Sequence, residues 1–186
     1  MTRSDIIPMV LFGAILVSLG INTPQAANEI IARLFDKSIS NSELQPSQSD
    51  VNRFQAILTD KSEPEIRKIL AQRALGTKIT ESVLADYASK NEIKPTVGEV
   101  ESAYSVIKSW TADLESSLEY SDEDIERYRL LMAKGMAKNW KLSKALYNTY
   151  GGDVVMQQTN PLTPVGAYQE LFEQYREQGE FVIYDP

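Results

Sequence analysis

The side chains that could do chemistry in this chain are few in kind, because its 186 residues include neither histidine nor cysteine. This composition excludes thiol nucleophiles, disulfides, metal sites built from these residues and every acid–base mechanism that uses an imidazole. Carboxylates, lysines, tyrosines and hydroxyl groups remain for chemistry near neutral pH. No arrangement of them is typical of an active site, so we predict no catalytic residue and no enzyme activity.

The densest group of carboxylates is formed by Asp122, Glu123, Asp124 and Glu126. A calcium loop needs oxygen ligands at alternating positions and a glycine turn, and this segment lacks that pattern. Ser121 and Asp124 have instead the spacing of a helix start, and negative side chains stabilise the positive end of a helix dipole. We therefore expect helix capping here, and we predict no metal site and no cofactor.

Aromatic residues and methionines recur along the segment that follows. They form the predicted polypeptide-binding groove: Tyr128, Met132, Met136, Trp140, Tyr147 and Tyr150. Methionine adapts to partners of varied shape, and aromatic residues often anchor binding. Residues at helical spacing also commonly pack in a core, and this alternative stays open.

Lysines recur in the same segment, at Lys134, Lys138, Lys141 and Lys144. We interpret them as a solvated polar face, with recognition of an anionic ligand as the alternative. Ser143 lies beside Lys144, but a Ser-x-x-Lys dyad needs another spacing. The sequence therefore does not support a Ser–Lys hydrolase.

The first 26 residues have the three-part layout of a signal peptide. Arg3 and the amino terminus provide positive charge, and Ile6–Leu19 is an almost unbroken apolar run. This run is shorter than the roughly 20 residues of a membrane span. We predict that residues 1–26 direct export, to the periplasm, with an uncleaved anchor facing the periplasm as the alternative.

The composition and net charge of the chain limit the classes of binding partner that we expect for residues 27–186. A hydrophobic content of 42% and a charged content of 24% are ordinary for a globular protein. The net charge of −7 disfavours nucleic acid and anionic lipid surfaces. We expect a single helical domain over residues 27–186, with a membrane contact only through an uncleaved leader and a protein or peptide as partner.

Helical spacing and capping boxes dominate the pattern of this domain. The boxes pair Ser62 with Glu65 and Thr96 with Glu99. The expected helices cover Ala27–Phe35, 51–58, 62–76 with a stop at Gly76, Glu81–Asn91, 96–114, Asp122–Tyr150 with a stop at Gly151-Gly152, and 163–178 with a stop at Gly179. The segment Lys37–Asp50 is predicted to be a loop.

The tail adds two predicted strands, at Asp153–Gln158 and Phe181–Tyr184, on either side of the last helix. We expect them to pair into a short two-stranded ribbon near the C-terminus. The second strand is also a candidate for pairing with the edge of another chain, although ordinary packing is the simpler interpretation. The predicted fold class is mainly α, a helical bundle with this short β element.

In residues 65–107, EIRKILAQRALGTKITESVLADYASKNEIKPTVGEVESAYSVI, a predicted helix is followed by a second that ends in ADYASKNEI, and Pro95-Thr96 with EVESAYSVI opens the next helix. The segment resembles the N-terminal helical region of periplasmic SurA-type and PpiC-type chaperones and peptidyl-prolyl isomerases. The positions that match the family's turn and cap are Ala88, Asn91, Ile93, Thr96, Glu99 and Val100. The resemblance implies binding of extended, apolar polypeptide. The family's isomerase activity belongs to a parvulin domain, which usually carries histidines, and this chain has none.

These observations lead us to expect an exported, non-catalytic, chaperone-like protein of the cell envelope. An accessory or structural subunit that docks on one envelope protein is the first alternative. A histidine-free hydrolase that uses carboxylates is the second.

Overall fold

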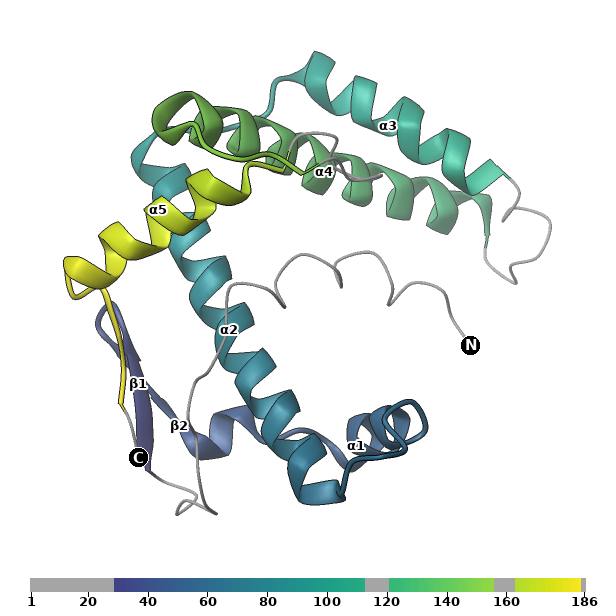
Figure 1. The fold of residues 1–186 in the computed structure, drawn as a ribbon. Helices are drawn as coiled ribbons and strands as arrows, with labels where there is room; N and C mark the ends of the chain where they lie inside the picture. Colours follow the sequence, from purple (N-terminus) through teal and green to yellow (C-terminus); the bar gives the residue numbers. More distant parts are fainter. Residues whose placement is uncertain (1–28, 113–120, 156–162, 185–186) are drawn as a thin grey trace. The chain divides into compact units, whose positions relative to one another are not determined.

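The computed structural model describes residues 29–112, 121–155 and 163–184, and this part of the chain is mainly α-helical with a small antiparallel sheet (Figure 1). The predicted fold class is confirmed. In chain order the elements are β1 (Ile30–Leu34), β2 (Lys37–Ser40), η2 (Asn41–Leu44), α1 (Gln48–Gln55), α2 (Glu63–Lys90), α3 (Val97–Thr111), α4 (Asp122–Tyr150), α5 (Val165–Glu177) and β3 (Phe181–Ile183). The predicted leader, residues 1–26, lies outside the described residues.

The chain divides into two compact units, and the boundaries fall within α2 and α5. Of the described residues, one unit comprises 29–85 together with 172–184, and the other comprises those between 86 and 171. The expectation of a single domain over 27–186 stays a prediction. None of the helices in the described part of the chain has the length and apolar character needed to cross a membrane.

The first unit contains a three-stranded sheet in the order β2-β1-β3, with both pairs antiparallel. The prediction of a helix over Ala27–Phe35 is wrong, because Ile30–Leu34 is the central strand. The prediction of a loop over Lys37–Asp50 is also wrong, since it contains β2, η2 and the start of α1. Isoleucine favours strands, and pairing on both sides of β1 outweighs a spacing that also fits a helix.

The last strand, β3, confirms the predicted strand after α5, but its partner differs from the one expected. It pairs with β1 from the N-terminal part, so the β element has three strands rather than two. Gly179 has a φ of +71° that turns the chain after α5, and the Arg33 guanidinium donates to the Gly179 carbonyl oxygen at 2.8 Å. Of the strand predicted at 153–158, Val155 makes one bridge, to Thr163, and residues 156–158 lie outside the described residues.

Helix α2 runs without a break from Glu63 to Lys90, so the predicted stop at Gly76 is wrong. The predicted start is confirmed, because Glu65 accepts from the Ser62 backbone N–H at 2.8 Å. A glycine inside a helix costs about 1 kcal/mol relative to alanine. The fully buried side chains of Leu75 and Val83 on either side outweigh that cost.

In the second unit, α3 and α4 pack against each other. Their shared core contains Ala103, Ile107, Ala133, Met136 and Ala137. The predicted cap of α3 is confirmed, because Thr96 and Glu99 form both hydrogen bonds of a capping box. Three small alanines in this core let the two helices approach closely, and this pair positions the candidate site.

Candidate functional site

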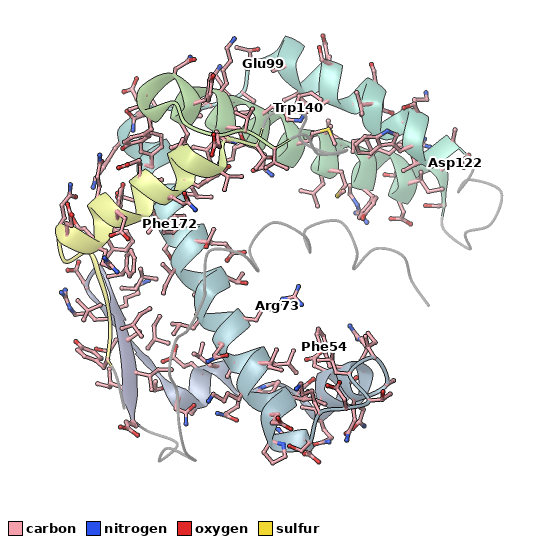
Figure 2. The ribbon with its side chains drawn as sticks, viewed as in Figure 1. Phe54, Arg73, Glu99, Asp122, Trp140 and Phe172 are labelled. Carbon is pink, nitrogen blue, oxygen red and sulfur yellow. The ribbon has the colours of Figure 1, made fainter. Side chains whose placement is uncertain are left out.

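The structure does not bring the six predicted groove residues together. Met132, Met136 and Trp140 pack in or against the core between α3 and α4, and Trp140 lies where these helices meet (Figure 2). Tyr128 and Tyr147 are 46% and 40% exposed. The alternative that these residues serve as core therefore describes three of the six, and no closed groove forms from the set.

A second face of α4 carries apolar residues at helical spacing, away from the face that packs on α3. Toward the C-terminus of the helix this second face is buried, with Leu142 at 3% and Leu146 at 0% exposure. Toward the N-terminus the same face is open, with Leu131 at 67% exposure and Tyr128 at 46%. We call Tyr128, Leu131 and Gly135 the exposed stripe. A Cβ added at Gly135 would meet nothing within 4 Å, so the stripe is open there as well.

Tyrosines from the end of α2 and the start of α5 lie against the C-terminal half of α4. The Tyr87 ring lies 6.3 Å from that of Tyr150, and its hydroxyl is 3.2 Å from that of Thr149. The Tyr168 hydroxyl is 3.3 Å from that of Ser143. Burial raises the pKa of Tyr168, and the Ser143 hydrogen bond partly offsets this. The hydroxyl that shares a hydrogen bond with Ser143 is thus that of a neutral tyrosine. This arrangement fits side-chain packing and does not fit a Ser–Lys dyad.

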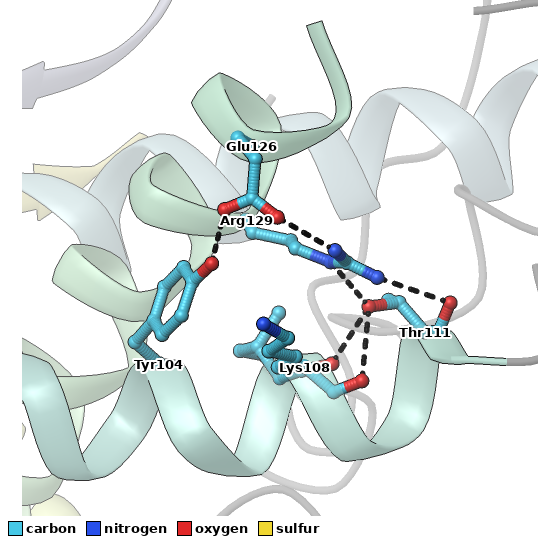
Figure 3. Close-up of polar contacts among 6 residues, drawn as sticks. Tyr104, Lys108, Thr111, Glu126 and Arg129 are labelled. Atoms are coloured by element: carbon cyan, nitrogen blue, oxygen red, sulfur yellow. Dashed lines mark hydrogen bonds and ion pairs between the residues drawn. The ribbon is translucent and has the colours of Figure 1, made fainter. Parts of the chain in front are cut away.

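A polar cluster lies where α3 ends and α4 begins (Figure 3). Arg129 is 2% exposed, and its guanidinium donates to the Thr111 hydroxyl at 2.8 Å, to the Thr111 carbonyl at 3.3 Å and to Glu126 at 2.8 Å. The Tyr104 hydroxyl donates to the other Glu126 oxygen. The carbonyls that end a helix lack partners within it, and Arg129 supplies one at the end of α3. Sequence reasoning missed this residue because its spacing from Glu126 is that of an ordinary surface ion pair.

The bonds within this cluster set the protonation of its carboxylate. The Tyr104 hydroxyl first, and then Arg129, hold the pKa of Glu126 below its ordinary value of 4.5. Glu126 is therefore ionised near neutral pH and accepts from two donors. A carboxylate of lowered pKa is a poor general base or acid at neutral pH, so the cluster fits a structural role.

The predicted helix start is confirmed: Ser121 is the N-cap of α4, and Asp122, Glu123 and Asp124 lie in its first turn, whereas Glu126 belongs to the cluster with Arg129. The Asp124 backbone N–H donates to the Ser121 hydroxyl at 3.2 Å, and the Asp124 carboxylate accepts from Arg127 at 2.7 Å. Within residues 29–112, 121–155 and 163–184, no group of three or more acidic side chains is arranged to hold a metal ion.

A small hollow lies between the start of α3 and the middle of α4. Its volume is about 210 Å³, and it is lined by Glu99, Ser102, Ala137, Trp140, Lys141 and Lys144. Lys141 forms an ion pair with Glu99 at 3.0 Å across it. The Thr96 backbone N–H first, and then Lys141, lower the pKa of Glu99. Pockets for drug-sized molecules usually measure about 300–1,000 Å³, so this hollow is smaller than a typical site of that kind.

Comparison with protein-family models, with curated proteins and with solved structures finds no match for this chain. The resemblance of residues 65–107 to SurA-type and PpiC-type proteins stays a prediction. The site that the structure offers is therefore the exposed stripe of α4. A signal for it existed in the sequence, because Leu131 follows Tyr128 on a face that the α3-facing residues Ala133, Met136 and Ala137 do not occupy.

Proposed function

We propose that this chain is a non-catalytic, chaperone-like binding protein that holds apolar segments of other polypeptides on the exposed stripe of α4. The observation that carries the proposal is the 67% exposure of Leu131 on a face that is buried farther along the same helix. Burying a leucine side chain contributes about 1.5–3 kcal/mol. The stripe thus holds unused binding energy in the described chain.

The charges beside the stripe favour one kind of polypeptide. Lys134 and Lys138 are exposed, and their spacing places them along one edge of the stripe. An apolar segment with acidic residues on one side would meet leucine and tyrosine at its centre and lysines at that side. Complementary charges at the rim of an interface speed association and orient the partner.

Two predictions from the sequence support a place in the cell envelope. The first 26 residues have the layout of an export signal, and residues 65–107 resemble the helical region of periplasmic chaperones. Both agree with a protein that binds unfolded or extended chains outside the cytoplasm, in the periplasm.

An accessory subunit that docks on one envelope protein is the second candidate. The observation that favours it is the continuity of the stripe with the buried face near Leu142 and Leu146. A helix of one partner protein could extend that packing in the way that neighbouring elements do within the chain.

The test compares two leucine-sized side chains of equal exposure. Leu131 and Ile57 are both 67% exposed, and Ile57 lies outside α4. We expect Leu131→Asp to weaken suppression of aggregation of several unrelated unfolded proteins by roughly tenfold, because about 1.4 kcal/mol or more of apolar contact is lost. Ile57→Asp serves as the matched control and should leave suppression unchanged.

The outcomes separate the candidates. Equal activity of the two variants and the unaltered chain would overturn the proposal that the stripe binds polypeptide. Capture of one stoichiometric partner, lost in Leu131→Asp, without general suppression of aggregation would favour the accessory subunit.

A further inference from the structure

Three exposed residues lie in one line along α4, at intervals of seven residues: Asp124, Leu131 and Lys138. Seven residues are about two turns of helix, so the acid and the lysine each lie about 10 Å from the leucine along the axis. Repeats of seven keep residues on one face, as in paired helices. The line therefore has an acidic end, an apolar centre and a basic end.

This line is complementary to itself when two copies run antiparallel. A two-fold axis through Leu131 would place the leucines of both copies in contact. It would also place Asp124 of each copy opposite Lys138 of the other, which gives two pairs of opposite charge. A parallel arrangement would instead oppose like charges at both ends, so the charges select the antiparallel one.

The neighbouring residues allow the helices to approach. Gly135 lies beside Leu131 on the stripe, and the space where its Cβ would be is open. Asp124 accepts from Arg127 at 2.7 Å, but both side chains are well exposed, at 48% and 81%. Ion pairs with this exposure contribute little, so Asp124 can exchange Arg127 for a lysine of a second copy at small cost.

We propose that α4 pairs antiparallel with α4 of a second copy of this chain through Asp124, Leu131 and Lys138. The pairing covers the exposed stripe and so competes with the binding of other polypeptides. This regulatory role rests on the proposed function, whereas the pairing itself does not. A contact made by one helix pair is small beside the roughly 1,200–2,000 Å² of a stable interface, so the dimer is weak and depends on concentration.

Charge reversal tests the pairing without changing Leu131. In Asp124→Lys, both ends of the antiparallel pair oppose lysine to lysine, and in Lys138→Glu both ends oppose two acids. We expect the unaltered full chain to approach twice its 20.9 kDa mass at high concentration in sedimentation equilibrium, and each variant alone to remain near 20.9 kDa.

An equimolar mixture of the two variants restores opposite charges at both ends and should recover the dimer. Recovery also shows that both variants are folded, and helix content by circular dichroism checks this independently. A mixture that stays at the mass of one chain, or an unaltered chain that does so at every concentration, overturns the pairing.

The absence of cysteine allows a second measurement in the full chain. Leu131→Cys places one thiol on the proposed two-fold axis, and Ile57→Cys places one at a site of equal exposure, 67%. Under mild oxidation we expect disulfide-linked dimers several-fold faster from Leu131→Cys. Equal rates for both variants would contradict the geometry.

The regulatory role is tested separately. An unfolded client protein added in excess should shift the unaltered chain from dimer to single chain. A dimer that persists while aggregation is still suppressed would overturn the competition but not the proposed function. Loss of suppression in Leu131→Asp without any dimer in the unaltered chain would support the function and overturn the pairing.

Discussion

The two halves of α4 carry apolar residues on the same face and bury them to opposite extents. Leu146 is fully buried, and Leu131, on the same face about four turns earlier, is 67% exposed. Tyr87 and Tyr168 lie against the C-terminal half through contacts with Tyr150 and Ser143. The difference shows that an apolar residue at a given position in a helix can pack against other elements. Whether it is buried within the chain depends on which elements lie beside it.

The contrast between the two halves of α4 is tested most directly by substituting Leu146 and Leu131. We expect Leu146→Ala to lower the free energy of unfolding by about 2–5 kcal/mol, because it removes packed atoms and leaves a cavity. Leu131→Ala should change it by no more than about 0.5 kcal/mol, as for other exposed sites. Urea unfolding followed by circular dichroism measures both. A large loss in Leu131→Ala would mean that this residue is packed in solution, and the contrast between the halves would fail.

Gly135, inside α4, and Gly151, at its C-terminal cap, extend the test to the backbone of the helix. Gly151 ends the helix with φ +66° and ψ −137°, a conformation that suits glycine alone. We expect Gly151→Ala to destabilise the fold by about 1–3 kcal/mol. Gly135 lies in the helix interior with open space at its Cβ, so Gly135→Ala should stabilise it by about 0.5–1 kcal/mol. Thermal unfolding would show opposite shifts of Tm, and shifts of the same sign would contradict this account.

The smallest effect concerns the acid response of the N-terminal half. The pKa of Glu126 is below 4.5 in the folded chain, so its contribution to stability is present above pH 4.5 and is lost as the pH falls through the folded pKa. Tyr104→Phe removes the largest cause of that shift, so the pKa of Glu126 should rise toward 4.5 and the acid-dependent loss from this group should shrink. NMR titration of the Glu126 carboxyl carbon measures the pKa directly.

Tyr128→Phe is the matched control for this titration, because it changes an exposed tyrosine of α4 that lies on another face of the helix. An unchanged Glu126 pKa in Tyr104→Phe, or an equal shift in the control, would mean that the hydrogen bond from Tyr104 does not set the protonation of this carboxylate.

Local patterns predicted the elements where local interactions decide them. The capping boxes at Ser62 and Thr96 and the stop at Gly151 depend on atoms a few residues apart, and the structure has all three. The predicted stop at Gly76 failed, because packing of distant side chains on α2 outweighs the local cost of a glycine. The exposed stripe was predicted only in part, because the predicted groove residues include Tyr128 but not Leu131.

By itself, the sequence determined the mainly α class, the capped helix starts at Ser62, Thr96 and Ser121, and the absence of thiol and imidazole side chains, because composition and neighbouring residues are enough for these. The tertiary structure alone decided that Ile30–Leu34 is the centre of a sheet, because one of its two partner strands, β3, lies at the other end of the chain. It also decided that Arg129 is buried and that Leu131 is not. Burial depends on which elements meet in space, and spacing along one helix does not contain that information.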